Sequence, residues 1–266
     1  MKLKGHFFGQ NAVDGNAGDY GGWWGVLSGC VPDARDLAMA FADIGYTTTA
    51  DFSGYNVAGA SVPWILTLDC TRDAWRALHT DLQAEAQLGD TYIIGNSGHG
   101  GTYPTAGAPG QTLCFADGMI EDGEFFDMMR AWPAGVRVAY ILDTCYSGGM
   151  DRDRLRAPIR AAPKWVSDRS PMRAQRPAMK SSDIQAQVIQ LCACQWDQTA
   201  SDGPHNGAFT GSLLAIWQQA RQAARSITWR EWMRATTAIM RSAFPDQVPE
   251  LNVLGAGSAM VDEAVW

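Results

Sequence analysis

Two residues of this chain, His99 and Cys145, carry reactive side chains in matching positions. Cys145 comes two residues after Asp143, which ends the apolar run 138–142, and it is followed by Tyr-Ser-Gly-Gly. His99 lies in Ser-Gly-His-Gly-Gly, directly after the apolar run 91–96. Apolar runs rich in β-branched and aromatic residues are typical of strands buried on both faces. If the two strands are neighbours, imidazole and thiol face each other at the carboxyl edge of a sheet, where open α/β sheets bind ligands.

This pairing predicts nucleophilic catalysis by a cysteine. A thiol becomes an effective nucleophile when a nearby base takes its proton. An isolated cysteine beside a turn is more often an inert buried residue. An isolated histidine is more often structural, which is our interpretation of His6, His79 and His205. His99 differs because it has a partner of suitable chemistry.

The elements that must position this pair alternate along the chain. Apolar runs predict strands at 3–9, 46–50, 91–96, 138–142 and 188–194, with a last edge strand within 247–255. Helical spacing and capping residues predict helices at 32–44, after Thr71, and at 120–132, 207–224 and 228–244. A long loop is expected after Gly101. Alternating strands and helices favour an α/β fold with a mostly parallel sheet.

Composition narrows the class of protein. The chain has 266 residues, of which 46% are hydrophobic and 18% charged, as in a globular protein with a sizeable core. A net charge of −7 argues against a general nucleic-acid binder. Six cysteines are too few for a disulfide scaffold, and no apolar run reaches membrane-spanning length. We saw no signal peptide and expect a cytoplasmic protein with no nucleic-acid or membrane partner.

We expect one domain over 1–266, interrupted by a basic flexible loop at about 150–182. Residues 150–180 hold nine Arg and Lys against three Asp and show no apolar periodicity. Such a segment is typical of a solvated linker.

Four short motifs in this order resemble those of the metacaspases and related caspase-like cysteine peptidases. Two of them surround His99 and Cys145. The other two are the early Gly-Cys-Val-Pro-Asp-Ala segment at 29–34, and the block Asp-Gln-Thr-Ala at 197–200 with Gly-Ala-Phe-Thr at 207–210. The resemblance runs from about residue 3 to 255. One departure is Tyr146, which stands where the family usually has histidine.

The resemblance implies a fold and a reaction. The fold would be a three-layer α/β/α sandwich, caspase-like, on a six-stranded, mostly parallel sheet. The reaction would be peptide-bond hydrolysis through an acyl-enzyme, with Cys145 attacking the carbonyl and His99 handling the proton. The N–H groups of Gly100 and Cys145 would form the oxyanion hole.

The resemblance also implies specificity for basic residues. The family's acids that bind an arginine or lysine side chain (the S1 pocket) fall on Asp33 and Asp143, helped by a serine that falls on Ser97. Carboxylates are the groups that a guanidinium or ammonium requires. Substrates would be peptides or proteins with Arg or Lys at the cleaved bond. The competing interpretations of Asp33 and Asp143 are a helix-start acid and a turn residue.

The resemblance also bears on metal binding. The chemistry requires no cofactor, but some family members are activated by Ca²⁺. The positions that resemble calcium ligands here are Asp122 and Asp151, whereas 102–111 contains no acid. Calcium takes six to eight oxygens, so the sequence fits either a weak site or none.

Two alternative functions stay beside the leading one. The chain could be a non-catalytic caspase-like binding module, or a peptidase that cuts after aspartate. The basic residues within 150–182 are candidate self-cleavage sites for an enzyme that cuts after Arg or Lys. We expect a monomer or weak dimer.

Overall fold

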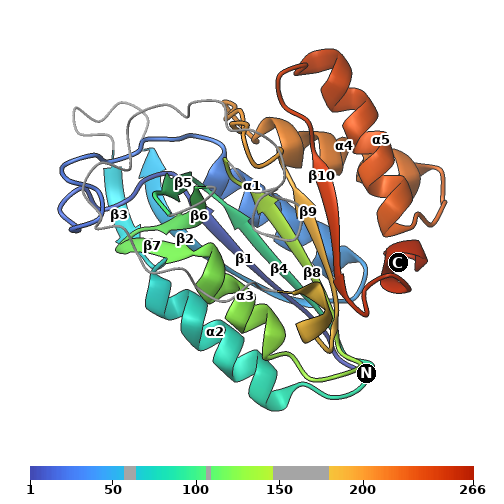
Figure 1. Cartoon of the computed structure of the whole chain (residues 1–266). Coiled ribbons are helices and arrows are strands. Elements are labelled where there is room, and N and C mark those ends of the chain that lie inside the picture. The colour runs from blue at the N-terminus through green and yellow to red at the C-terminus, as the bar shows by residue number, and fades with distance from the viewer. Residues whose placement is uncertain (57–63, 106–108, 146–179) are drawn as a thin grey trace.

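A twisted seven-stranded sheet runs through the centre of the structure (Figure 1). The computed structural model describes residues 1–56, 64–105, 109–145 and 180–266. Its strand order is β10-β9-β8-β4-β1-β2-β3, in which the five strands from β9 to β2 are parallel. The outer strands β10 and β3 pair antiparallel with their neighbours. The strands are β1 (Leu3–Gln10), β2 (Thr47–Asn56), β3 (Trp64–Leu68), β4 (Thr91–Ser97), β8 (Arg137–Asp143), β9 (Gln187–Cys192) and β10 (Glu250–Gly255).

Helices cover both faces of the sheet (Figure 1). Helices α2 (Arg72–Glu85) and α3 (Asp122–Arg130) lie on one face. Helices α1 (Cys30–Asp43), α4 (Ala208–Gln222) and α5 (Trp229–Ala243) lie on the other. The predicted three-layer α/β/α fold is therefore confirmed. The six strands that we expected form its sheet, and β3 adds a seventh at one edge.

Each face of the sheet buries its own apolar cluster. The α1/α4/α5 side is aromatic, with Trp217, Trp229 and Trp232 around Phe41. The α2/α3 side packs Trp75 and other aromatic rings against β4 and β8. The central strands are buried on both sides, and all seven residues of β4 are buried. This explains why they appear in the sequence as continuous apolar runs rather than alternating ones.

Helix ends follow the capping signals in the sequence. The Thr71 side chain accepts a hydrogen bond from the Ala74 N–H and begins α2. At α5, Thr228 and Glu231 form a reciprocal capping box. Such caps satisfy N–H groups that have no partner within the helix.

We expected a long loop after Gly101, and this prediction is wrong. The chain forms a second, three-stranded antiparallel sheet from β5 (Gly100–Tyr103), β6 (Gly110–Phe115) and β7 (Gly118–Glu121). All six residues of β6 are buried, including Gln111 and Thr112. Because several side chains of β6 are polar or small, its sequence lacks the apolar pattern that predicts a buried strand.

The basic segment at about 150–182 falls almost entirely outside the described residues. Only its end is seen, where Ser181–Asp183 form one short 3₁₀ turn that leads into β9. Within the described part of the chain, no helix combines the length and apolarity that crossing a bilayer requires.

Candidate active site

The two strands that carry His99 and Cys145 are neighbours. Strands β4 and β8 are parallel, and Ser97 pairs with Asp143 where both strands end. The Gly98 N–H donates to the Asp143 carbonyl at 3.2 Å and ties the two turns together. Parallel register therefore places His99 and Cys145, each two residues beyond this pair, at one edge of the sheet.

One pocket at this edge gathers every residue predicted for catalysis and for S1 except Gly100. Its lining comes from the ends of β4 and β8, from the start of α1, and from the segment between β9 and α4. The lining residues are Leu27, Cys30, Asp33, Ser97, Gly98, His99, Asp143, Cys145, Ala200, Ser201, Asp202 and Gly207.

The Cys145 thiol is partly buried among backbone N–H groups. Its Sγ lies 3.4 Å from the Ala200 nitrogen, which donates toward it. Burial raises the pKa of the thiol, and the N–H groups of Ala200, Gly100 and Cys145 itself oppose this by stabilising the thiolate. The N–H groups of Gly100 and Cys145 are the two predicted for the oxyanion hole.

Gly100 has no room for a side chain. A Cβ atom there would lie 2.0 Å from the Cys145 carbonyl oxygen. This close approach brings the Gly100 N–H within reach of the reactive residue. A glycine after the histidine is therefore a steric requirement of the site.

His99 is oriented by the segment between β1 and α1. Its Nε2 lies 2.8 Å from the Gly25 carbonyl oxygen, and its ring is edge-on to Trp23 at 4.6 Å between centroids. A carbonyl can only accept, so Nε2 carries the proton and Nδ1 of the neutral ring keeps its lone pair. Burial lowers the pKa of His99, while the Gly25 carbonyl and the Asp202 charge oppose that shift. Burial thus favours the neutral form of the imidazole.

Asp33 is fully buried at the start of α1. Its Oδ2 accepts from the Ser97 hydroxyl at 2.7 Å, and its Oδ1 accepts from the Gly207 N–H at 3.0 Å. The predicted S1 serine and acid are therefore in direct contact.

Asp143 is held by helix α4. Its Oδ2 accepts from both the N–H and the hydroxyl of Thr210, at 3.0 and 2.8 Å. A Cβ at Gly207 would lie 2.6 Å from Asp143 Oδ2 and 3.0 Å from Asp33 Oδ2. The two carboxylates therefore flank the same glycine, at the N-terminus of α4.

No cation of the described residues neutralises these two acids. Among the described residues, neither Asp33 nor Asp143 forms an ion pair. Burial, and then the charge of Asp143, raise the pKa of Asp33. Burial also raises the pKa of Asp143, to about 6, against the hydrogen bonds from Thr210. Two buried carboxylates without a counter-ion form a site that is electrostatically complementary to a cation.

The structure adds a third acid that sequence reasoning missed. Asp202 lines the same pocket, and its carboxylate accepts from the Ser28 and Gly29 N–H groups at 2.8 and 2.9 Å. Its charge also raises the pKa of Asp143. Asp202 and the Gly25 carbonyl come from loops without a motif, so only their contacts in the fold reveal them.

Asp122 does not form a metal site with the described residues. It is fully buried, and its carboxylate accepts from the Tyr103 hydroxyl at 2.7 Å and the Gln111 N–H at 3.1 Å. No group of three His, Cys, Asp or Glu side chains suited to a metal gathers within the described ranges. Asp151 lies outside them, so its proposed role is untested, and Asp122 serves here to hold the small sheet together.

The three remaining histidines lie in other surroundings. His79 is buried, contacting the Trp75 carbonyl and the Tyr140 hydroxyl, and burial lowers its pKa to about 4. His6 contacts Asp51 and Thr49 on β2. His205 is exposed, with its Nε2 3.4 Å from Asp36. None of them lines the pocket of Cys145.

Known proteins resemble this chain over most of its length. A sequence model of the family described as caspase domain matches residues 16–254. Metacaspase-1 of Mycosarcoma maydis is 22% identical over 280 residues, covering 88% of this chain and 68% of that protein. Metacaspase-4 of Arabidopsis thaliana is 28% identical over 140 residues, covering 50% of this chain and 32% of that protein.

A solved structure agrees with the fold. The crystal structure of protein GSU0716 from Geobacter sulfurreducens superposes with a TM-score of 0.75 at 26% identity, covering 99% of this chain and 97% of that one. Together with the family match over residues 16–254, the sheet order and the paired strand ends lead to one conclusion. The chain belongs to the caspase domain family.

Proposed function

We propose that this chain is a cysteine endopeptidase that cleaves peptide bonds after arginine or lysine, with Cys145 as nucleophile and His99 as base. The observation that carries the proposal is the pair of buried acids, Asp33 and Asp143. They line the same pocket as the thiol and the imidazole, and no cation of the described residues pairs with either.

The substrate's basic side chain would supply the missing cation. A guanidinium or ammonium entering the pocket pairs with Asp33 and Asp143 and lowers the pKa of both. Ser97 holds the Asp33 carboxylate in place, and Thr210 holds that of Asp143. Asp202 adds negative charge at the side of the pocket near Gly29. Caspase-like cleavage after aspartate would bring a fourth carboxylate toward this cluster, which like-charge repulsion disfavours.

The chemistry then proceeds by proton transfer within the pair. The Cys145 proton moves to Nδ1 of His99 while sulfur bonds to the scissile carbonyl carbon. The negative oxygen of the tetrahedral intermediate accepts from the N–H groups of Gly100 and Cys145. His99 returns the proton to the leaving amine as the C–N bond breaks. Water, deprotonated by the same imidazole, hydrolyses the thioester and restores the thiol.

The free site requires activation by its substrate. Burial favours the thiol form of Cys145 and the neutral form of His99, so the resting pair is uncharged. The Ala200 N–H approaches the sulfur at 3.4 Å. The segment that carries Ala200 must therefore make space before the peptide backbone of a substrate can reach the thiol.

Peptide turnover tests the proposal directly. Matched fluorogenic peptides ending in Arg, Lys, citrulline or Asp are offered to the wild-type chain, with and without Ca²⁺. We expect turnover of the Arg and Lys peptides alone, and none by Cys145→Ala or His99→Ala. Turnover of the Asp peptide would refute the pocket argument, and failure with every peptide would favour a non-catalytic binding module.

Self-processing is part of the proposal and has its own measurement. The basic residues within 150–182 would be cut by an enzyme of this specificity. Intact-mass spectrometry of purified wild-type protein should show fragments ending in Arg or Lys, and Cys145→Ala should stay whole. Identical intact masses in both would show that the chain does not cut itself.

A further inference from the structure

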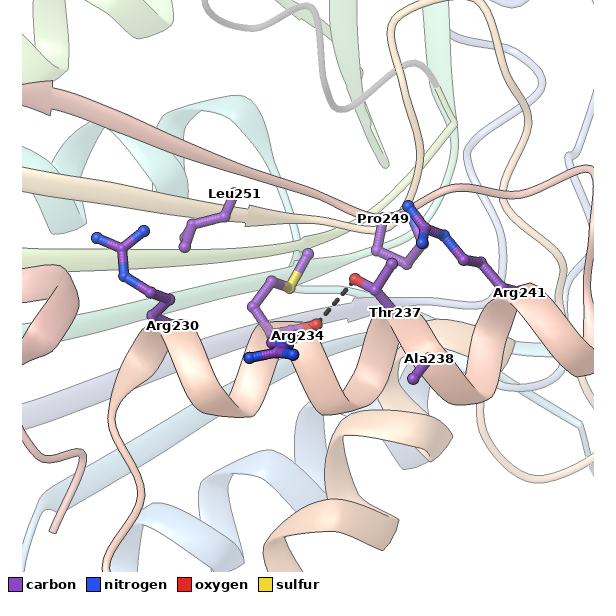
Figure 2. Close-up of a pocket in the computed structure, with 8 residues that line it drawn as sticks. Arg230, Arg234, Thr237, Ala238, Arg241, Pro249 and Leu251 are labelled. Atoms are coloured by element: carbon purple, nitrogen blue, oxygen red, sulfur yellow. Dashed lines mark hydrogen bonds between the residues drawn. The ribbon is translucent and has the colours of Figure 1, made fainter.

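A second groove lies between helix α5 and strand β10 (Figure 2). Its volume is about 360 Å³, and it shares no residue with the pocket of Cys145. Three arginines and an apolar floor line it. The lining residues are Arg230, Met233, Arg234, Thr237, Ala238, Arg241, Pro249 and Leu251.

The arginines form one stripe along α5. Arg230, Arg234 and Arg241 follow each other at spacings of four and seven residues, which places them on one side of a helix. Figure 2 shows them along the helix, with Pro249 and Leu251 opposite. Like charges one turn apart repel each other and weaken a helix. The stripe also stands out because the chain as a whole carries a charge of −7.

Two of these guanidinium groups form no ion pair with any described residue. Arg230 pairs with Asp262, at 2.7 and 3.1 Å. Within the described part of the chain, Arg234 and Arg241 form no ion pair. Glu250 is the nearest acid in sequence to the floor, but successive strand side chains alternate, so it projects to the face opposite Leu251.

The apolar floor sets this groove apart from a simple charged surface. Leu251 packs against the cluster on the α5 side of the sheet, and Met233 and Pro249 are buried beside it. Thr237 turns its hydroxyl back to the Met233 carbonyl at 2.8 Å, which leaves its methyl group toward the groove. A ligand here would meet cations along one side and hydrocarbon beneath.

The spread of the charges indicates an extended ligand. Arg234 and Arg241, the two arginines without an ion pair among the described residues, lie seven positions apart, which is about 10 Å along the helix at 1.5 Å per residue. One small anion cannot bridge that span, whereas an extended peptide of about four or five residues at about 3.3 Å per residue covers it. Guanidinium groups bind carboxylates with paired hydrogen bonds. An apolar side chain in such a peptide would rest on the floor.

We propose that this groove is a docking site for an extended, acidic segment of a partner protein, in which carboxylates flank an apolar residue. The inference does not depend on the proposed peptidase activity. The site would recruit a partner to the α5 side of the sheet, through residues that do not line the catalytic pocket.

The test measures binding of the fluorescein-labelled peptide Glu-Glu-Leu-Glu-Glu to the wild-type chain by fluorescence anisotropy. The peptide contains no Arg or Lys, so the proposed peptidase would not cut it. We expect binding that weakens as salt is raised, and at least tenfold weaker binding by Arg234→Gln/Arg241→Gln. The neutral peptide Gln-Gln-Leu-Gln-Gln should not bind.

A matched double variant separates a site from general charge. Arg130→Gln/Arg225→Gln removes the same total charge at exposed positions outside the groove, and it should bind within about twofold of wild type. Circular dichroism melting checks that both variants fold. The proposal is overturned if both variants lose binding equally, if the wild-type chain does not bind the acidic peptide, or if duplex DNA or anionic vesicles compete for the same arginines more strongly than the peptide.

Discussion

Replacing Asp143 by asparagine should lower activity and leave the fold as stable or more stable. Asparagine keeps one oxygen for the two hydrogen bonds from Thr210, which both reach Oδ2 in the wild-type chain. What it removes is the negative charge facing the pocket. The substitution therefore separates the role of Asp143 in binding from its role in folding.

The expected loss of activity follows from an unpaired cation. Removing one partner of a buried ion pair costs about 3–5 kcal/mol, and about 1.4 kcal/mol changes a rate or equilibrium tenfold. Asp33 still pairs with the substrate cation in the variant, so we expect a loss at the lower end of that range. We expect kcat/KM for an Arg peptide to fall roughly 100-fold to 1,000-fold. A citrulline peptide, which has the same shape without the charge, should lose far less.

The expected change in stability has the opposite sign. The pKa of Asp143 is about 6 in the fold, above its usual 3.8, so the folded state binds the proton more tightly than the unfolded state does. Wild-type stability therefore falls as pH rises through this window and levels off above it. At about 1.4 kcal/mol per pKa unit, ionised Asp143 costs about 3 kcal/mol at pH 8. The asparagine variant is spared that cost.

Two measurements decide this prediction. Urea unfolding of both proteins at pH 5 and pH 8 should show a larger advantage of the variant at pH 8. Initial rates with the Arg and citrulline peptides give the loss of discrimination. The reasoning is refuted if the variant keeps the wild-type preference for Arg over citrulline, or if it is less stable than wild type at pH 8.

Two further predictions concern the oxyanion hole and the two pocket acids. Gly100→Ala should lower kcat by at least about 100-fold and should also lower the melting temperature, because its Cβ would lie 2.0 Å from the Cys145 carbonyl oxygen. The backbone must shift to relieve this contact, which displaces an oxyanion donor. Wild-type kcat in this variant would remove the N–H of Gly100 from the mechanism. The pH profiles should also differ, since kcat/KM reports groups of the free enzyme and kcat those of the complex. A bound cation lowers the pKa of Asp33 and Asp143, so the acid limb of kcat should lie at lower pH than that of kcat/KM, and coincident limbs would contradict the pocket assignment.

The sequence alone determined the layers of the fold. The central strands are buried on both faces, so they appear in the sequence as unbroken apolar runs. Capping residues such as Thr71 and Thr228 indicate where helices begin. These signals are local, because burial and capping act on neighbouring residues. The sequence did not predict the small β5–β7 sheet, because the buried residues Gln111 and Thr112 are polar and interrupt any apolar pattern.

The sequence also named the residues that could do chemistry, and the tertiary structure decided how they meet. His99 and Cys145 share one edge because β4 and β8 pair in parallel register. Asp202 and the Gly25 carbonyl carry no local signal, since they reach the site from loops that are far apart in the chain. That no described cation pairs with Asp33 or Asp143 is likewise a property of the packed pocket. Charge balance in a buried site depends on every group that folding brings near it, and no single stretch of sequence contains that information.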